Sequence, residues 1–180
     1  MKLKNLLRDF NLLATTSRGN EKQLCSELSY LLKEGICDPA PTVERTGIRG
    51  LVVAKTSFDP FFAIDKFRNI LLERPYEFRY ALRIIPIERV VFTNLDEIKH
   101  MAAELSAKIG VDETFRVTVE KRFTSFHSQD LIESVASALK NKVDLKNPSK
   151  ILLIEVIGKL TGISIIKGND ILAVVKEKLL

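Results

Sequence analysis

The side chains in this sequence best suited to binding chemistry are arginines and lysines that recur along expected strands. Arg79 and Arg83 fall on the same side of an alternating segment, so both should project from one face of a strand. Arg116 and Arg122 share the polar side of a later alternating segment, with Lys121 next to Arg122. A guanidinium group can contact phosphate through two parallel hydrogen bonds. Solvation of the surface explains any one of these charges, but the paired pattern indicates an anionic partner such as nucleic acid.

Further basic residues stand in expected turns. Arg49 lies at the tip of a turn between two strands, where it can reach a phosphate group. A group of lysines surrounds the turn expected at Asn147-Pro148: Lys140, Lys142, Lys146 and Lys150. Nine of the 11 arginines fall at or before residue 89, and the net charge is +4 for residues 1–90 against +1 for residues 91–180. Such charges would supply affinity for RNA or DNA that is sensitive to salt and independent of sequence.

The residues that could support catalysis form no recognisable constellation. The chain has two histidines and two cysteines, too few and too scattered for a structural zinc site, so no metal is expected. It also lacks the glycine-rich motifs that bind nucleotide phosphates, and no cofactor is expected. Cys25 lies beside an apolar helical stripe, where a buried and inert thiol is the commoner outcome. A small enzyme or ligand-binding protein with a pocket near Cys25 or His127 stays open as an alternative.

The composition of the chain is typical of a globular protein. The 180 residues carry a net charge of +5, and 46% of them are hydrophobic, which is typical of a globular protein with a core. No apolar run is long enough to span a membrane, and the first residues lack the apolar region of a signal peptide. We therefore expect a cytoplasmic protein without a membrane partner, whose cysteines are reduced.

The first half of the chain predicts the element order β-α-β-β-α-β. Strands are expected at 10–16, 42–46, 51–56 and 78–85, with a helix after Asn20 and a second after Asp59-Pro60. Gly47 and Gly50 supply the positive φ angles of the hairpin turn between the middle strands. This order is that of a ferredoxin-like domain, which we place at residues 1–93.

The second half predicts α-β-α-β-β, followed by a tail of unsettled type at 171–180. Helices should begin near Asn94 and Ser128, and strands are expected at 115–123, 151–157 and 161–166. We place this second domain at residues 94–180. The predicted class is therefore α+β, with two domains that account for the whole chain.

Residues 95–180 resemble a THUMP domain. The similarity is carried by Thr-Phe-Arg-Val-Thr-Val-Glu-Lys-Arg-Phe at 114–123 and by Val-Asp-Leu-Lys-Asn-Pro at 143–148, which leads into a strand containing Glu155. Such domains commonly follow a ferredoxin-like domain. In addition, Arg79-Tyr80-x-x-Arg83-x-x-Pro86 looks like the junction in the THUMP adaptor of the tRNA cytidine acetyltransferase.

The resemblance implies a module that binds the acceptor region of tRNA and presents the tRNA to a modifying enzyme. Because 180 residues have no room for a further catalytic domain, we expect a noncatalytic adaptor, with the acetyltransferase that forms N4-acetylcytidine in the D-arm as its partner. An assembly subunit of another RNA-modifying complex is an alternative. The positions that match the THUMP pattern imply RNA contacts at Lys121, Arg122 and the turn with Lys146. The full predicted set of RNA-binding residues comprises Lys121, Arg122, Lys146, Lys150, Arg79, Arg83, Arg116 and Arg49. Asp144, Asn147 and Pro148 are interpreted as turn formers.

Overall fold

The computed structural model describes residues 7–179, which divide into two compact units. Unit 1 runs to Ile87 and resumes at Asp170, whereas unit 2 comprises Glu88–Asn169. Both units combine helices with a sheet, which confirms the predicted α+β class. Among the described residues, none of the helices has the length and apolar character needed to cross a membrane.

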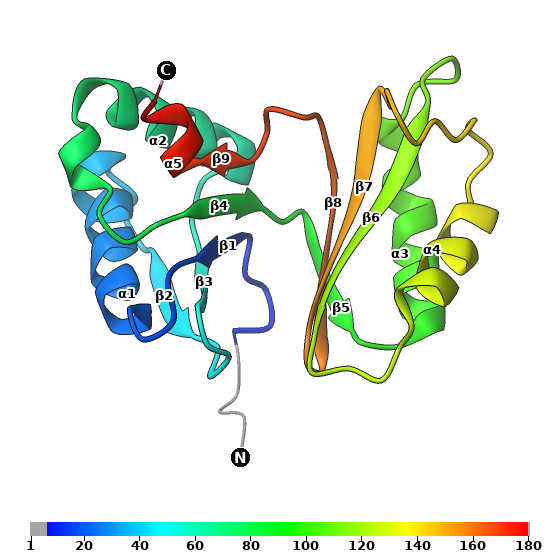
Figure 1. Ribbon diagram of the computed structural model, residues 1–180, viewed down its shortest axis with the longest axis horizontal. Coiled ribbons are helices and arrows are strands. Elements are labelled where there is room, and N and C mark those ends of the chain that lie inside the picture. Colours follow the sequence, from blue (N-terminus) through cyan, green and yellow to red (C-terminus); the bar gives the residue numbers. More distant parts are fainter. Residues whose placement is uncertain (1–6, 180) are drawn as a thin grey trace. The chain divides into compact units, whose positions relative to one another are not determined.

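Within the described part of the chain, unit 1 is built on a five-stranded antiparallel sheet in the order β2-β3-β1-β4-β9 (Figure 1). Its elements are β1 (Leu12–Thr15), α1 (Glu21–Tyr30), η1 (Leu31–Gly35), β2 (Thr42–Arg45), β3 (Leu51–Lys55), α2 (Pro60–Glu73), η2 (Pro75–Glu77), β4 (Arg83–Pro86), β9 (Leu172–Ala173) and α5 (Val174–Glu177). Buried side chains of α1 and α2, such as Leu28 and Phe67, share one core with Leu12 and Ile84 of the sheet. The predicted order β-α-β-β-α-β is thus found in the structure.

Local signals in the sequence explain where these elements begin and turn. The Asp59 carboxylate accepts hydrogen bonds from the N–H groups of Phe61 (2.9 Å) and Phe62 (3.1 Å), which caps α2 as expected. Gly50 has φ +76°, and a Cβ atom there would lie 2.8 Å from the carbonyl oxygen of Thr16. The turn between β2 and β3 therefore requires glycine at this position.

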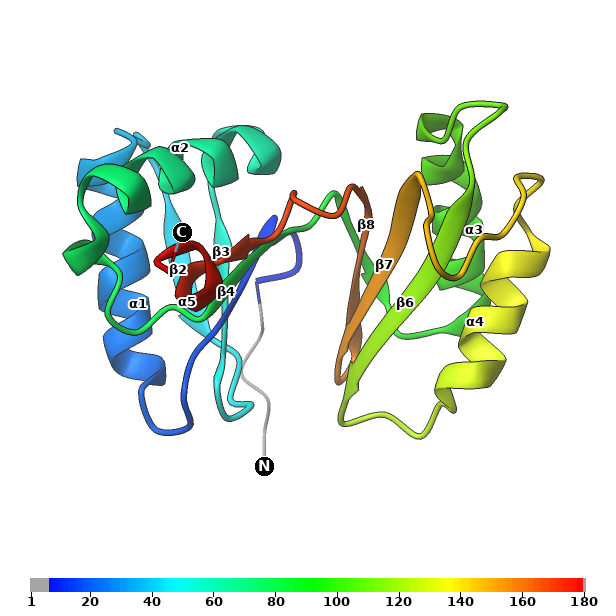
Figure 2. The same cartoon turned by 45° about the horizontal axis from the view of Figure 1, so that its top comes forward.

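Unit 2 has, over the residues that the structure describes, a four-stranded sheet in the order β5-β8-β7-β6 (Figure 2). Its elements are β5 (Arg89–Phe92), α3 (Leu95–Leu105), η3 (Ser106–Lys108), β6 (Phe115–Arg122), α4 (Ser128–Ser137), β7 (Lys150–Ile157) and β8 (Leu160–Ile166). β6 and β7 are parallel, whereas β8 is antiparallel to both β7 and β5. Helices α3 and α4 cover one face of the sheet, where Ala102 and Val135 share a core with Phe115 and Ile154.

One predicted strand is shorter than expected. The alternation at 78–85 predicts a strand throughout, but β4 begins only at Arg83. The N–H groups of Arg79, Tyr80 and Ala81 bind the carboxylate of Glu27 in α1 instead of a neighbouring strand. Arg79 and Arg83 therefore do not share the face of one strand, and this part of the prediction was wrong.

The division of the chain differs from the predicted boundary at residues 93 and 94 in two respects. β5, which the sequence analysis did not identify, pairs with β8 and belongs to unit 2. The tail belongs to unit 1, because β9 pairs with β4 through Arg83–Ala173 and Ile84–Leu172. In addition, the strand predicted at 115–123 ends one residue earlier, at Arg122. Phe123 has φ +55°, and this residue is 76% exposed.

Candidate nucleic-acid interface

Strand β6 separates the predicted basic residues of unit 2 into two groups. In the parallel register, Phe115 lies opposite Lys150 at one end of the strand and Arg122 lies opposite Ile157 at the other. At about 3.3 Å per residue, the two ends are roughly 23 Å apart. Lys121 and Arg122 therefore form no continuous patch with Lys146 and Lys150.

The first group lies on residues 140–150, which we call the lysine loop. Its four lysines and one aspartate give the loop a net charge of +3. The N–H of Phe115 donates to the carbonyl of Lys142 (3.0 Å), and the N–H of Asp144 donates to the carbonyl of Phe115 (2.9 Å). The start of β6 thus holds one side of the loop through its backbone.

Asp144 shapes the tip of the lysine loop. Its Oδ1 atom accepts hydrogen bonds from the N–H groups of Lys146 and Asn147, both at 3.0 Å, which is the geometry of an Asx turn. The hydrogen bonds from Asn147 and Lys146 lower the pKa of the Asp144 carboxyl. The predicted role of Asp144 as a turn former is confirmed, and the carboxylate that forms the turn is stabilised in its charged state.

Arg116 and Lys150 lie at the base of the lysine loop, and both have partners within the protein. The Nη1 atom of Arg116 donates to the carbonyl of Leu145 (3.1 Å), so this guanidinium fixes the loop from β6. The Nζ atom of Lys150 lies 3.8 Å from Oε1 of Glu113, and its side chain is largely buried. Both residues therefore position the loop in this structure.

Several side chains of the loop are exposed to solvent, among them the lysines Lys140, Lys142 and Lys146 and the apolar residues Val143 (46% exposed) and Leu145 (69% exposed). Within residues 7–179, none of these three lysines forms an ion pair. Their ammonium groups are therefore available to an anionic partner, on a backbone that is already held in place.

The second group, at the end of β6, has structural partners. Nη1 of Arg122 lies 2.8 Å from Oε2 of Glu155, whose carboxylate is almost fully buried. Nζ of Lys121 donates to the carbonyl of Phe126 (2.8 Å), which supports the turn that leads into α4. The implied RNA contacts of Lys121 and Arg122 stay predictions, and in this structure both side chains are bound to the protein.

The three predicted residues of unit 1 lie in different surroundings. Arg49 is exposed in the turn between β2 and β3, and Arg83 is exposed at the start of β4. Arg79 is exposed in the irregular segment before β4, where its Nε atom donates to the carbonyl of Tyr76 at 3.4 Å.

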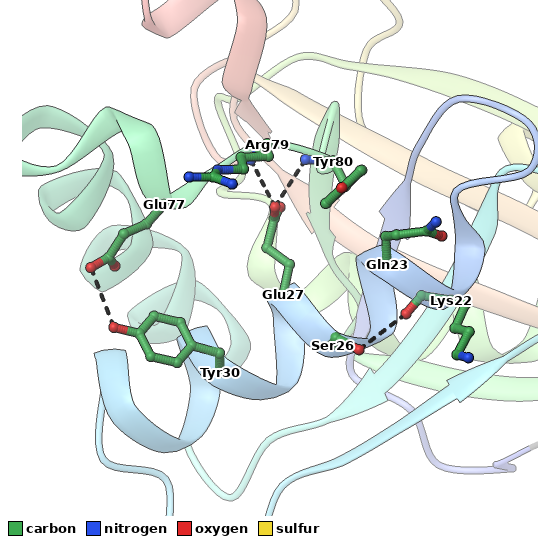
Figure 3. A pocket seen from close by; sticks show the side chains of 8 residues that line it. All are labelled: Lys22, Gln23, Ser26, Glu27, Tyr30, Glu77, Arg79 and Tyr80. Carbon is green, nitrogen blue, oxygen red and sulfur yellow. Dashed lines mark hydrogen bonds between the residues drawn. The ribbon is translucent and has the colours of Figure 1, made fainter.

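Unit 1 also contains an open hollow beside Arg79 that the sequence analysis did not identify (Figure 3). On its α1 side lie Gln23, Glu27 and Tyr30. They recur at intervals of four and three residues, which places them on one face of the helix. The spacing of these three residues could have indicated the hollow from the sequence. The apolar residues of the same helix follow a stronger helical pattern, however, and the prediction was based on them.

The groups considered for catalysis are dispersed. Cys25 is half-buried beside the core of unit 1, and desolvation by burial raises the pKa of its thiol, which opposes a role as a nucleophile. His127 is exposed at the start of α4. Over residues 7–179, His, Cys, Asp and Glu side chains form no cluster of three that could hold a metal ion.

The fold and the lysine loop together define unit 2 as an α+β domain with a basic, preformed loop at one end of its sheet. Residues 92–166 match the family model of the THUMP domain, and this part of the chain is a THUMP domain. Domains of this family are associated with RNA binding and tRNA modification.

Similarity to known proteins extends beyond this domain. The sequence is 28% identical over 152 residues to uncharacterized protein MJ0421 of Methanocaldococcus jannaschii, a match that covers 82% of this chain and 39% of that protein. The crystal structure of PH1313 from Pyrococcus horikoshii has a TM-score of 0.66 at 20% identity, over 89% of this chain and 56% of PH1313. A 4-thiouridine synthetase in complex with RNA and ATP has a TM-score of 0.52 at 14% identity, over 87% of this chain and 41% of the synthetase. The structural likenesses show the fold, and this chain spans about two fifths of the length of MJ0421.

Proposed function

We propose that this chain is a tRNA-binding adaptor, which contributes no catalytic group and presents tRNA to a modification enzyme. The observation that carries the proposal is the lysine loop of the THUMP domain, with exposed lysines on a hydrogen-bonded backbone. The association of THUMP domains with tRNA modification supports RNA as the anionic partner.

The geometry of the loop explains how it would bind RNA. Asp144 and Arg116 fix the backbone, so binding orders only the flexible side chains of Lys142 and Lys146. Each phosphate that a lysine neutralises releases condensed counterions, which supplies affinity at low salt. Leu145, exposed between these lysines, offers an apolar contact to an unstacked base or a ribose.

A binding experiment tests this role of the loop. We expect Lys142→Ala/Lys146→Ala to weaken tRNA binding roughly five- to fiftyfold at low salt and to reduce the slope of log affinity against log salt by about 1–2. The control Lys66→Ala/Lys159→Ala removes the same charge from exposed positions on α2 and in the β7–β8 turn. Titration of labelled tRNA at several salt concentrations measures both quantities. Equal losses in the two double variants would contradict a specific role for the lysine loop.

The finer part of the proposal concerns the acceptor end and the partner enzyme. It is supported by the resemblance of 143–148 to the THUMP pattern and of Arg79–Pro86 to the adaptor of the tRNA cytidine acetyltransferase. Loss of the gene should abolish N4-acetylcytidine in tRNA, as measured by mass spectrometry of nucleosides. Unchanged acetylcytidine would exclude this partner, whereas the RNA-binding proposal would still be judged by the titration above.

A further inference from the structure

The hollow in unit 1 has the size and residue types of a ligand site. Its volume is about 480 Å³, within the usual range for small-molecule sites. One wall is α1 and the other is the segment that precedes β4 (Figure 3). The lining residues are Lys22, Gln23, Ser26, Glu27, Tyr30, Glu77, Arg79 and Tyr80.

Glu27 holds the second wall in place. Its Oε2 atom accepts hydrogen bonds from the N–H groups of Arg79 (2.7 Å) and Tyr80 (2.9 Å), and its Oε1 atom accepts one from Ala81 (2.9 Å). On the other side of the segment, the Thr16 hydroxyl donates to the carbonyl of Tyr80 (2.7 Å). The wall is therefore preformed, so a ligand would not have to order it.

Two cations that line the hollow are available to a ligand. The Glu27 carboxylate is occupied by three N–H groups, and Oε1 of Glu77 lies 3.3 Å from Nη1 of Arg74 and 3.4 Å from the Tyr30 hydroxyl. Lys22 and Arg79 are exposed, and within residues 7–179 neither forms an ion pair. Each carboxylate thus has hydrogen-bond or ion-pair partners within the protein, whereas the two cations are available to an anion.

Aromatic rings accompany these cations. The chain contains three tyrosines and no tryptophan, and Tyr30 and Tyr80 line the hollow. Figure 3 shows Tyr30 on α1 and Tyr80 on the opposite wall, with Glu27 between them. Tyr30 is 45% exposed, so its ring can receive a planar group. Aromatic rings with adjacent cations are the usual recognition elements for unpaired nucleotides.

We propose that this hollow binds an unstacked nucleotide of single-stranded RNA. The base stacks on the ring of Tyr30, and the phosphates on its two sides contact Lys22 at one end of the hollow and Arg79 at the other. The amide of Gln23 offers a donor and an acceptor to the edge of the base. This inference rests on the proposed RNA-binding function and adds to it a second contact, in unit 1.

The tyrosines provide a direct readout. In Tyr76→Phe, both remaining tyrosines line the hollow, and no tryptophan contributes to the emission. We expect a short single-stranded RNA to quench this tyrosine fluorescence to saturation, because a base stacks on the ring. An abasic oligonucleotide of the same length should bind only through phosphate and leave the emission unchanged. Absence of quenching, or equal quenching by the abasic probe, would overturn the proposal.

Substitution of Tyr30 separates stacking from hydrogen bonding. Tyr30→Ala should weaken binding of labelled single-stranded RNA roughly 5- to 100-fold, whereas Tyr30→Phe, which keeps the ring and loses the bond to Glu77, should bind like the wild type. Equal losses in both variants would contradict stacking. If circular dichroism shows that Tyr30→Ala is not folded, the phosphate contact is tested in the same assay by comparing Lys22→Ala with the control Lys66→Ala. Equal affinities of these two variants for RNA would overturn the phosphate contact.

The same assay distinguishes failure of this inference from failure of the proposed function. Lys142→Ala/Lys146→Ala should lose affinity for tRNA but retain the fluorescence quenching by short RNA. Quenching by a wild-type protein that has no affinity for tRNA would overturn the proposed function alone. Normal tRNA binding without quenching would overturn the nucleotide site alone.

Discussion

Arg122 shows how a basic residue that resembles a ligand contact can have a structural role. Its guanidinium lies 2.8 Å from the carboxylate of Glu155, which is 1% exposed. Removing the cation would leave a buried carboxylate without this partner, a change that is strongly unfavourable in a protein interior. The ion pair joins neighbouring strands of the sheet, since Arg122 lies in β6 and Glu155 in β7.

We therefore expect Arg122→Met to lower the free energy of unfolding by about 1–3 kcal/mol, as measured by urea denaturation. The double variant Arg122→Met/Glu155→Gln removes the buried charge as well and should recover part of this loss. Unchanged stability in Arg122→Met, together with weaker RNA binding, would show that the residue acts as an RNA contact instead.

The carboxyl group of Asp38 should make the free energy of unfolding depend on pH. Burial raises the pKa of its carboxyl, but hydrogen bonds from the Thr56 hydroxyl and from the N–H groups of Ser57 and Ala40 outweigh this effect, so the pKa is lowered. Because the pKa of Asp38 is lower in the folded than in the unfolded state, its charged carboxylate stabilises the fold at pH values above the unfolded pKa. This stabilisation is lost as the pH falls through the folded pKa. Asp38→Asn should cost about 1–3 kcal/mol at neutral pH, with the difference from wild type shrinking below about pH 4. A difference that is constant with pH, in urea denaturation, would contradict the role of the charged carboxylate.

At the scale of single elements, patterns within a few residues predicted most of the fold. The cap at Asp59, the glycines of the β2–β3 turn and the turn at Asp144 depend on neighbours in the sequence, and the structure has all three. The irregular segment before β4 depends on Glu27, about 50 residues earlier in the chain. Alternation of residue types carries no information about such a distant acceptor, and for that reason the predicted strand was too long.

The turn between β2 and β3 gives a test at this scale. Gly50→Ala should lower the free energy of unfolding by about 1–3 kcal/mol, because the position has φ +76° and the new Cβ would meet the Thr16 carbonyl. Gly168→Ala is the matched control, since a Cβ there meets nothing within 4 Å, and it should change stability by less than about 0.5 kcal/mol. Thermal or urea unfolding of both variants measures the difference, and similar values for the two would contradict the packing at Gly50.

At the scale of the whole molecule, the chain leaves unit 1, forms unit 2 and returns to unit 1 through its last described residues. Leu172 is fully buried at the edge of the sheet, and Nε of Arg68 in α2 lies 2.8 Å from Oε2 of Glu177 in α5. The apolar and basic composition of the tail did not reveal this pairing, because strand partners far apart in sequence leave no local periodicity.

Loss of the tail contacts should weaken unit 1. Leu172→Ala should cost about 2–4 kcal/mol, because it leaves a cavity beside β4. Hydrogen exchange should then show faster exchange at the β4 amides. The control Leu179→Ala changes a side chain that is 83% exposed and should alter neither quantity. Unchanged exchange in β4 after Leu172→Ala would contradict the assignment of the tail to unit 1.

We propose that the lysine loop of the THUMP domain binds the acceptor end of tRNA. The most direct test compares the affinities of intact tRNA and tRNA trimmed of its single-stranded 3′ end, for the wild type and for Lys142→Ala/Lys146→Ala. We predict that the wild type binds intact tRNA more tightly and that the double variant loses this preference. Equal affinity of the wild-type protein for both tRNAs, or a preference that persists in the double variant, would contradict the claim.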